Sequence, residues 1–294
     1  MPSNLFRRYV APATARPQVW RLILGLVLSL AVYAGWVALI LATMVAVSGV
    51  DSATAWARAL AEGATPTATL VLFISFLGMA AGPMLAARLL HGRGPATLFG
   101  PRVRVLRDFV VAALAVAAIY APGLVIWSLI YDAVPNLDLW LWLAYLPAAL
   151  LGILIQTGAE ELVFRGYMTQ QLAARFRSPL IWLAGPAVLF GLVHYNPATA
   201  GDNAWLLVGS ATVFGLVAAD LTRVTGSLGA AWGFHFANNL VAILILATAG
   251  TIEGLSLYLT PYPAEAGGMV RALMGGDILL MLLVWALLRR LLPR

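Results

Sequence analysis

The chain contains a series of long apolar segments separated by short polar stretches, and this pattern restricts it to few folds. A helix that crosses a bilayer needs about 20 mostly apolar residues. Eight segments meet or approach that length: 20–47, 68–90, 107–131, 139–165, 179–195, 204–222, 227–249 and 274–292. Charged residues make up only 10% of the chain, whereas a soluble globule has about 25%. The pattern predicts an all-α polytopic membrane protein with about eight transmembrane helices.

The charged residues lie in the connections between these segments and predict how the chain crosses the bilayer. All basic residues are arginines, and most lie in the second, fourth and sixth connections or after the last segment. Asp and Glu predominate in the other connections. The positive-inside rule then predicts eight spans with both termini in the cytoplasm. Topology and contact with anionic lipid account for the net charge of +6, so no nucleic acid partner is expected.

The first apolar segment follows a basic tail, as the core of a signal peptide does. At 20–47 it is much longer than the 7–15 residues of such a core. We therefore expect a cytoplasmic N-terminal tail at 1–18 and one transmembrane domain at 19–294. The arginine-only, alanine-rich composition is typical of GC-rich prokaryotic genomes, which predicts a multi-pass protein of a prokaryotic cell (inner) membrane.

Ionisable side chains inside membrane spans are costly, and they are therefore functional candidates. Few are present, and with one asparagine they form three short motifs: Glu160-Glu161-x-x-x-Arg165, Phe190-x-x-x-His194 and His235-x-x-x-Asn239. Glu160 and His194 each lie 17 residues from Arg177, which predicts a similar depth in the membrane. A helical extension over 166–178 at the cytoplasmic interface would bring His235 to the same depth.

The two adjacent glutamates are expected to have different surroundings on a helix. Glu161 and Arg165 are four residues apart and can form an ion pair. Glu160 points about 100° away and stays free. An unpaired carboxyl in an apolar setting favours its neutral form, which suits a general base near neutral pH. The alternative is that both glutamates serve one structural ion-pair network.

His235 and Asn239 are also four residues apart and share a helix face. An imidazole and a carboxamide are two donors that can bind one oxygen, as an oxyanion hole requires. The alternative is that His235 is a hydrogen-bonded packing residue.

The order and spacing of the three motifs on hydrophobic segments resemble the CPBP family. This family includes CAAX prenyl proteases of the Rce1 type and bacteriocin-processing or self-immunity (ABI) membrane proteins. The stretch from Phe214-Gly215 through Thr225-Gly226-Ser227-Leu228 also resembles the family's later motif region. The resemblance covers about 140–245, the core of the transmembrane domain.

The resemblance implies a glutamate-dependent intramembrane endopeptidase acting on a membrane-associated or CAAX-like substrate. It implies that Glu160 and His194 activate a water, and that His235 and Asn239 hold the tetrahedral oxyanion. Glu161 and Arg165 would support the motif helix. The expected partners are a protein or peptide substrate and the lipid bilayer. The sequence leaves the natural substrate, its prenylation and the oligomeric state open.

Metal dependence is a further open point. The chain has no cysteine and no His-Glu-x-x-His motif, so neither a thiolate site nor that zinc signature is present. Metal-free chemistry with no cofactor is therefore favoured. Zinc is the alternative, and Glu160, His194 and His235 would then be its ligands.

Other functions have weaker support from the sequence. The Gly-x-Ser-Gly pattern expected of a rhomboid-like serine protease is absent. Met274 interrupts the Gly-x-Gly-Asp pattern of a presenilin-like aspartyl protease. A transporter would show inverted repeats or paired broken helices, and neither is seen. A non-catalytic membrane scaffold or self-immunity protein of the same fold stays as the alternative.

Overall fold

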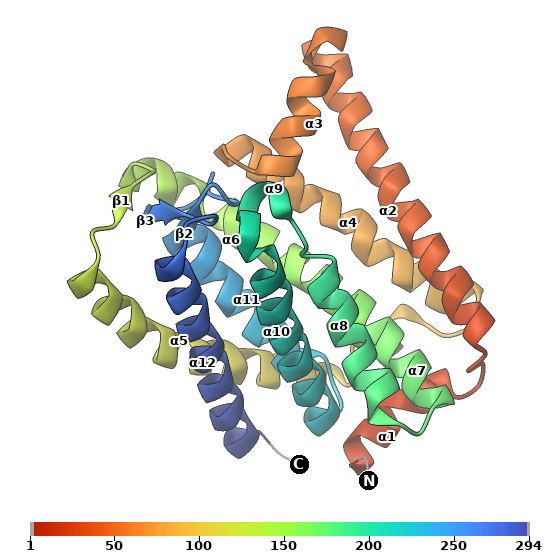
Figure 1. Ribbon diagram of the computed structural model, residues 1–294. Coiled ribbons are helices and arrows are strands. Elements are labelled where there is room, and N and C mark those ends of the chain that lie inside the picture. The colour runs from red at the N-terminus through yellow and green to blue at the C-terminus, as the bar shows by residue number, and fades with distance from the viewer. Residues whose placement is uncertain (1–2, 293–294) are drawn as a thin grey trace.

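A computed structural model of the protein describes residues 3–292, and almost all regular structure in them is helical (Figure 1). The helices are α1 (Asn4–Val10), α2 (Val19–Ser48), α3 (Ala53–Glu62), α4 (Pro66–Leu89), α5 (Arg102–Ile130), α6 (Leu139–Glu161), α7 (Thr169–Arg175), α8 (Gly185–Leu192), α9 (Pro197–Ala200), α10 (Ala204–Thr225), α11 (Gly229–Leu240) and α12 (Gly268–Leu291). Three π-helical stretches adjoin them, at Leu162–Met168, Leu180–Ala184 and Val241–Ile245.

Six helices within the described residues are long and apolar enough to cross a bilayer: Val19–Ser48, Pro66–Leu89, Arg102–Ile130, Leu139–Arg175, Pro197–Thr225 and Gly268–Leu291. The other two expected spans form shorter apolar helices, Leu180–Leu192 and Gly229–Ile245. The prediction of a polytopic all-α membrane protein is confirmed. The count of eight spans stays a prediction, because a helix of 13 residues is only about 20 Å long.

The two short helices end earlier than the apolar pattern suggests. Helix α8 ends at Leu192, and Asn196 is not helical, as expected of a residue before proline. The chain leaves the other helix at Leu246, where strand β2 (Leu246–Ala249) begins. The expected helix 227–249 and the expected loop 250–268 are therefore both partly strand.

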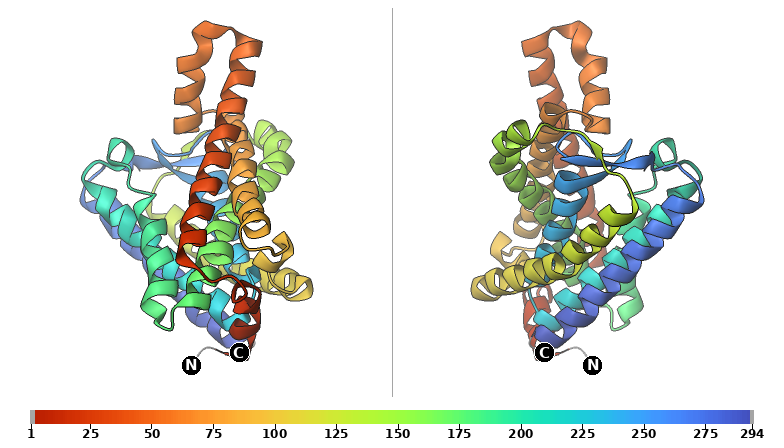
Figure 2. Two further views of the ribbon diagram at one scale, coloured as in Figure 1. Left: turned by 90° about the vertical axis from the view of Figure 1, so that its right-hand side faces the viewer. Right: turned by 90° about the vertical axis from the view of Figure 1, so that its left-hand side faces the viewer.

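A small sheet at one end of the molecule consists of β1 (Val134–Pro135), β3 (Tyr258–Pro263) and β2, in that order. Strand β3 pairs antiparallel with β1 and parallel with β2. Tyr and Thr side chains, which favour extended backbone, recur along β3. The sheet and α3 lie at the end of the molecule opposite to α1 and the last turn of α12 (Figures 1 and 2).

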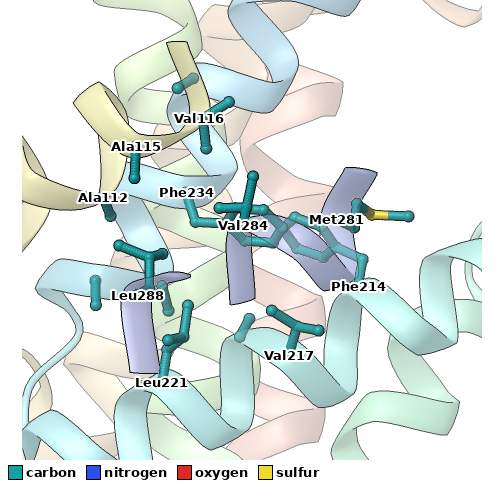
Figure 3. Close-up of a cluster of buried hydrophobic side chains, with 14 of the residues drawn as sticks. Ala112, Ala115, Val116, Phe214, Val217, Leu221, Phe234, Met281, Val284 and Leu288 are labelled. Atoms are coloured by element: carbon teal, nitrogen blue, oxygen red, sulfur yellow. The ribbon is translucent and has the colours of Figure 1, made fainter. Parts of the chain in front are cut away.

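The largest apolar core lies where α5, α10, α11 and α12 meet (Figure 3). Each helix contributes residues spaced three or four apart, which share one helix face. They include Ala112, Ala115, Val116, Phe214, Val217, Leu221, Phe234, Met281, Val284 and Leu288. Gly233 of α11 lets this helix approach α5 closely, since a Cβ there would clash with the Phe109 carbonyl oxygen. The close packing fixes the position of α11, and with it His235.

Residues 3–18 of the expected N-terminal tail pack against the helices. Ser3 caps α1 by accepting a hydrogen bond from the Phe6 amide at 3.2 Å. Phe6 and Tyr9 are buried, and the Phe6 ring packs on Trp182 with centroids 4.9 Å apart. Helix α1 therefore covers the lower end of the helices in Figure 1. Arg294, part of the predicted basic C-terminus, lies outside the described residues.

Candidate active site

The first motif lies where α6 passes into a π-helical stretch. Glu160 and Glu161 end α6, and the wider turn Leu162–Met168 follows before α7. The helical path from Leu139 to Arg175 is continuous, so the expected extension beyond 166 forms as far as Arg175. Its residues 166–171 are buried, not spread along an interface. The motif on α11 is likewise followed by a π-helical turn, a feature found frequently at functional sites.

Glu161 lies at the centre of a fully buried charged group. Its Oε1 accepts from Arg165 Nη1 at 2.9 Å and from His235 Nδ1 at 2.9 Å. Arg165 also donates to the Gly215 carbonyl oxygen at 3.3 Å, and its guanidinium lies 4.6 Å from the Phe190 ring centroid. A buried ion pair needs such additional partners to offset desolvation. The predicted Glu161–Arg165 pair is present, and it also orients His235.

Glu160 has a different set of contacts. Its Oε1 accepts a hydrogen bond from Gln156 Nε2 at 2.7 Å. Its Oε2 lies 3.5 Å from His235 Nε2 and, within residues 3–292, has no hydrogen-bond partner. The Glu160 side chain is only 12% exposed. One oxygen thus fixes the carboxylate while the other stays unsatisfied, an arrangement that calls for an explanation in a buried setting.

His235 lies between the two carboxylates. Its Nδ1 faces Glu161 and its Nε2 faces Glu160, while the Phe214 ring contacts it with centroids 4.7 Å apart. When Nδ1 donates its proton to Glu161, a neutral ring has no proton on Nε2. Nε2 can then donate only if the ring carries protons on both nitrogens. The imidazole is held in one orientation by charge and by aromatic packing.

Asn239 does not stand beside His235 as an isolated second donor. Its Nδ2 donates to Gln156 Oε1 at 2.9 Å, and its Oδ1 accepts from Asn238 at 3.2 Å. Gln156 therefore bridges Asn239 and Glu160. Gln156 was not predicted as a site residue, although an amide one turn before Glu160 in an apolar span was a visible signal.

His194 lies in the turn after α8, outside the helix in which it was expected. Its Nδ1 bonds to the Phe190 carbonyl oxygen at 2.7 Å, and its ring packs on Phe190 with centroids 4.7 Å apart. Phe190 also contacts His235, at 5.9 Å between centroids. In the described chain His194 has no direct hydrogen bond to Glu160 or His235. The three motifs are thus neighbours joined through the Phe190 ring.

Comparison with known proteins gives an independent view of this region. Residues 138–241 match the family model described as type II CAAX prenyl endopeptidase Rce1-like. These residues form an Rce1-like domain of the CPBP family. The resemblance predicted from the motifs is confirmed. No solved structure matches the chain.

The chain also has a relative among curated proteins. It is "Uncharacterized protein YyaK" of Bacillus subtilis (strain 168), 34% identical over 120 residues. The matched region covers 40% of this chain and 39% of that protein. The chain therefore aligns with about two fifths of the relative's length. All six predicted site residues lie within 138–241, and their individual roles stay predictions.

In the Rce1-like domain, α6, which carries the two glutamates, packs tightly against α11, which carries His235. A Cβ at Gly158 of α6 would lie 2.8 Å from the Trp232 ring of α11. Trp232 Nε1 donates to the Leu154 carbonyl oxygen at 3.1 Å, which fixes the contact. Small residues at helix interfaces allow such close approach in membrane proteins. The close approach of α6 and α11 brings Glu160 within reach of His235.

The three suggested zinc ligands of the Rce1-like domain do not converge on one point. No group of three or more His, Asp or Glu side chains in residues 3–292 is arranged to hold a metal ion. Glu160 and His235 are neighbours, but His194 is turned toward the Phe190 carbonyl. Because these three side chains do not form a zinc set as placed, no step below runs through a metal.

Proposed function

We propose that this protein is an intramembrane endopeptidase in which Glu160 is the general base. The observation that carries the proposal is the Glu160 carboxylate, whose Oε1 is held by Gln156 while its buried Oε2 is free beside His235. A base must be fixed in place and must keep a lone pair for a proton. The Rce1-like family supports a protease, and the contacts of Glu160 support this role.

Hydrolysis then proceeds through one tetrahedral intermediate. Glu160 takes a proton from a water molecule, and the water oxygen attacks the peptide carbonyl carbon. The carbonyl oxygen becomes an oxyanion. It accepts hydrogen bonds from the Asn239 amide and from Nε2–H of a His235 ring that carries protons on both nitrogens. The proton held by Glu160 passes to the leaving nitrogen as the C–N bond breaks, giving a carboxylic acid and an amine.

His194 completes the proposal as a second group that orients the water. Because Nδ1 bonds to the Phe190 carbonyl, a neutral His194 ring carries its proton there and keeps Nε2 as an acceptor. A water that donates to both Glu160 and His194 would be aligned for attack. Glu161 and Arg165 touch no substrate in this scheme; they hold His235 and the motif helix.

We further propose that the protein lies in a prokaryotic inner membrane with both termini in the cytoplasm. Arginines of α1, of the turn after α7 and of the last turn of α12 support this orientation. The substrate class that fits is a membrane-associated protein or a CAAX-like peptide. Oligomeric state does not enter the mechanism.

The proposed chemistry uses no cofactor, and this is tested separately. Activity of the purified protein is expected to be unchanged after treatment with a strong zinc chelator. Activity that is lost on chelation and restored by added zinc would overturn the metal-free scheme. Activity that is unchanged by the chelator supports Glu160 as a base that activates water without a metal ion.

A non-catalytic membrane scaffold is the second candidate, and one observation favours it. The group Glu161–Arg165–His235 links α6 to α11 and, through Gly215, to α10. Such links hold helices together whether or not peptide bonds are cut. The scaffold would keep its biological effect in Glu160→Gln, whereas the protease would lose it.

Comparison of membrane proteomes tests the proposal. Membrane fractions are compared between cells with the wild-type protein and cells with Glu160→Gln, and new protein C-termini are identified by mass spectrometry. Glu62→Gln is the matched control, because Glu62 is 59% exposed and its ion pair within residues 3–292 is with Arg58. We expect a set of C-termini present with wild type and Glu62→Gln and absent with Glu160→Gln. Identical sets in all three would refute the protease.

A further inference from the structure

A cavity of about 620 Å³ lies among α5, α11, α12 and the strands β2 and β3, and neither Glu160 nor Glu161 lines it. Its walls are mainly apolar and aromatic, with Trp127, Leu273 and Leu280 among them. At its rim Ile126, Ile130 and Leu279 are more than half exposed. Because these residues lie on membrane-spanning helices, the cavity opens toward the lipid. Its volume falls within the roughly 300–1,000 Å³ of small-molecule sites.

An unpaired carboxylate lines this cavity. Asp277 lies nine residues into α12, about 14 Å along that helix. Within residues 3–292 its side chain has no hydrogen bond and no ion pair. Arg271, the basic residue on the same half of α12, instead donates to Asn203 at 2.8 Å. An ionisable side chain within a span is costly and is rarely left without a partner.

Other polar side chains also line the cavity, those of Tyr120, Tyr131, Asn238, Thr248, Thr260 and Tyr262. Tyr120 and Asn238 both line the cavity, and Tyr120 lies close enough to Asp277 for the two to interact electrostatically. The Tyr120 hydroxyl donates its proton to Asn238 Oδ1 at 3.0 Å. The phenol oxygen therefore keeps lone pairs for a donor in the cavity. Near Asp277 the cavity thus offers two acceptors, a carboxylate and a phenol oxygen, and its wall also contains the hydroxyls of Thr248, Thr260 and Tyr262.

This arrangement selects one kind of occupant. Acceptors in an apolar cavity need a ligand with N–H donors, and the carboxylate needs a positive charge. We propose that the cavity binds a cationic amphiphile from the bilayer, with its primary ammonium against Asp277 and Tyr120 and its apolar chain along Trp127 and Leu280. The proposal goes beyond the protease and does not depend on it.

The site is connected to Glu160 by a directed chain of hydrogen bonds. Tyr120 donates to Asn238, Asn238 to Asn239 at 3.2 Å, Asn239 to Gln156 at 2.9 Å, and Gln156 to Glu160 at 2.7 Å. Every donor points toward Glu160. An ammonium on the Tyr120 oxygen polarises the first member of this chain. A ligand in the cavity therefore acts on the residues around Glu160 without touching them.

Thermal unfolding of the full protein in phosphatidylcholine vesicles tests the site, with dodecylamine as the probe and dodecanol as the uncharged control. A ligand that binds only the folded state raises the unfolding midpoint with concentration. We expect a saturating rise with dodecylamine in wild type and none with dodecanol. Asp277→Asn is expected to abolish the rise, because it removes the charge but no existing bond.

A second variant tests the cavity without altering the carboxylate. Gly276 lines the cavity, and a Cβ added there would meet no heavy atom within 4 Å, so Gly276→Leu fills the space without a backbone clash. Gly275 is equally open but does not line the cavity, and Gly275→Leu is the matched control. We expect Gly276→Leu to lose the response to dodecylamine and Gly275→Leu to keep it. An equal rise in wild type, Asp277→Asn and Gly276→Leu, or no rise in wild type, would overturn the proposal.

Discussion

Two buried polar clusters lie along the same helical path from Leu139 to Arg175, and they are built differently. The carboxylate cluster consists of Gln156, Glu160, Glu161, Arg165, His235 and Asn239. The α7 cluster consists of Tyr9, His91, Arg93, Tyr167 and Gln170, all at most 7% exposed. The first contains two carboxylates, and each has one buried oxygen without a hydrogen-bond partner in residues 3–292. Glu161 is paired with Arg165, whereas the second oxygen of Glu160 lies beside His235. The second contains no acid.

The partners of the α7 cluster are largely main-chain oxygens and neutral side chains. Tyr9 donates to the Leu98 carbonyl at 2.8 Å, Gln170 to the Thr97 carbonyl at 2.9 Å, and Arg93 to the Gln170 side chain. His91 bonds to the Tyr167 hydroxyl at 2.8 Å. These bonds fasten α1 and the 90–101 connection to the helical path. Burial of polar groups alone therefore does not make a reactive site. Glu160 differs in being a fixed carboxylate that has no arginine partner within residues 3–292 and is 12% exposed beside His235.

The two histidines give the largest expected contrast. His194→Ala is expected to lower the cleavage rate about 10²–10⁴-fold, the usual range for loss of a group that moves or orients a proton. His91→Ala is expected to keep the rate per folded molecule, because the hydrogen bonds of the His91 ring within residues 3–292 go to Tyr167 and the Arg16 carbonyl, away from Glu160. Rates are measured on purified protein, normalised to folded material. Equal rate losses in the two variants would remove the functional distinction between the clusters.

Substitution of the buried arginine of each cluster, Arg165 or Arg93, is expected to lower the free energy of unfolding by different amounts. Arg165→Met leaves Glu161 buried without its guanidinium and is expected to lower the free energy of unfolding by about 3–5 kcal/mol. Arg93→Met leaves no carboxylate unpaired, so about 1–3 kcal/mol is expected from its lost hydrogen bonds. Unfolding is followed by denaturant titration in mild detergent. A larger loss in Arg93→Met would contradict the ion-pair account.

Substitution of the amide residues Asn239 and Gln170 is expected to change the cleavage rate in one case and the free energy of unfolding in the other. Asn239→Leu removes an expected oxyanion donor and should lower the rate about 10²–10³-fold. Gln170→Leu removes the bond to the Thr97 carbonyl and should lower stability by about 1–3 kcal/mol while the rate of folded protein is kept. Both quantities are measured on each variant. An unchanged rate in Asn239→Leu would exclude that residue from the oxyanion site.

The smallest effect is a pH dependence in the α7 cluster. Burial, together with the nearby Arg93, lowers the pKa of His91 from its ordinary value of 6.5. The unfolded chain therefore takes up a proton below about pH 6.5 that the folded chain resists, so the free energy of unfolding falls as the pH falls. His91→Gln is expected to flatten this fall between about pH 6.5 and 5. Parallel curves for the two proteins would show that His91 does not titrate in this way.

Much of the architecture could be predicted from sequence because membrane helices are coded locally. Apolar length predicted the six long apolar helices and the two shorter ones. The four-residue spacing of Glu161 and Arg165 predicted their ion pair. The helix ends were harder to predict. Strand β2 begins within an apolar run, and nothing local separates Leu246 from the helical residues before it.

The sequence predicted which residues form the site more completely than it predicted their contacts. Motif order identified six residues, but the bridge through Gln156 depends on how α6 and α11 face each other, which spacing within one helix does not give. Likewise, His194 was expected inside a span, while the helix ends before it and its Nδ1 bonds to Phe190. Asp277 belongs to the Gly-x-Gly-Asp-like stretch that Met274 interrupts, and its cavity forms only where α5, α11 and α12 pack with the strands β2 and β3.

The central claim is that the adjacent residues Glu160 and Glu161 have different roles: Glu160 is the general base, and Glu161 holds His235 and stabilises the fold. The most direct test measures cleavage and unfolding on the same vesicle-reconstituted samples of wild type, Glu160→Gln and Glu161→Gln, using a substrate found in the membrane proteome comparison. The account predicts that Glu160→Gln is inactive and as stable as wild type, whereas Glu161→Gln is markedly less stable. Cleavage by Glu160→Gln at the wild-type rate would contradict it.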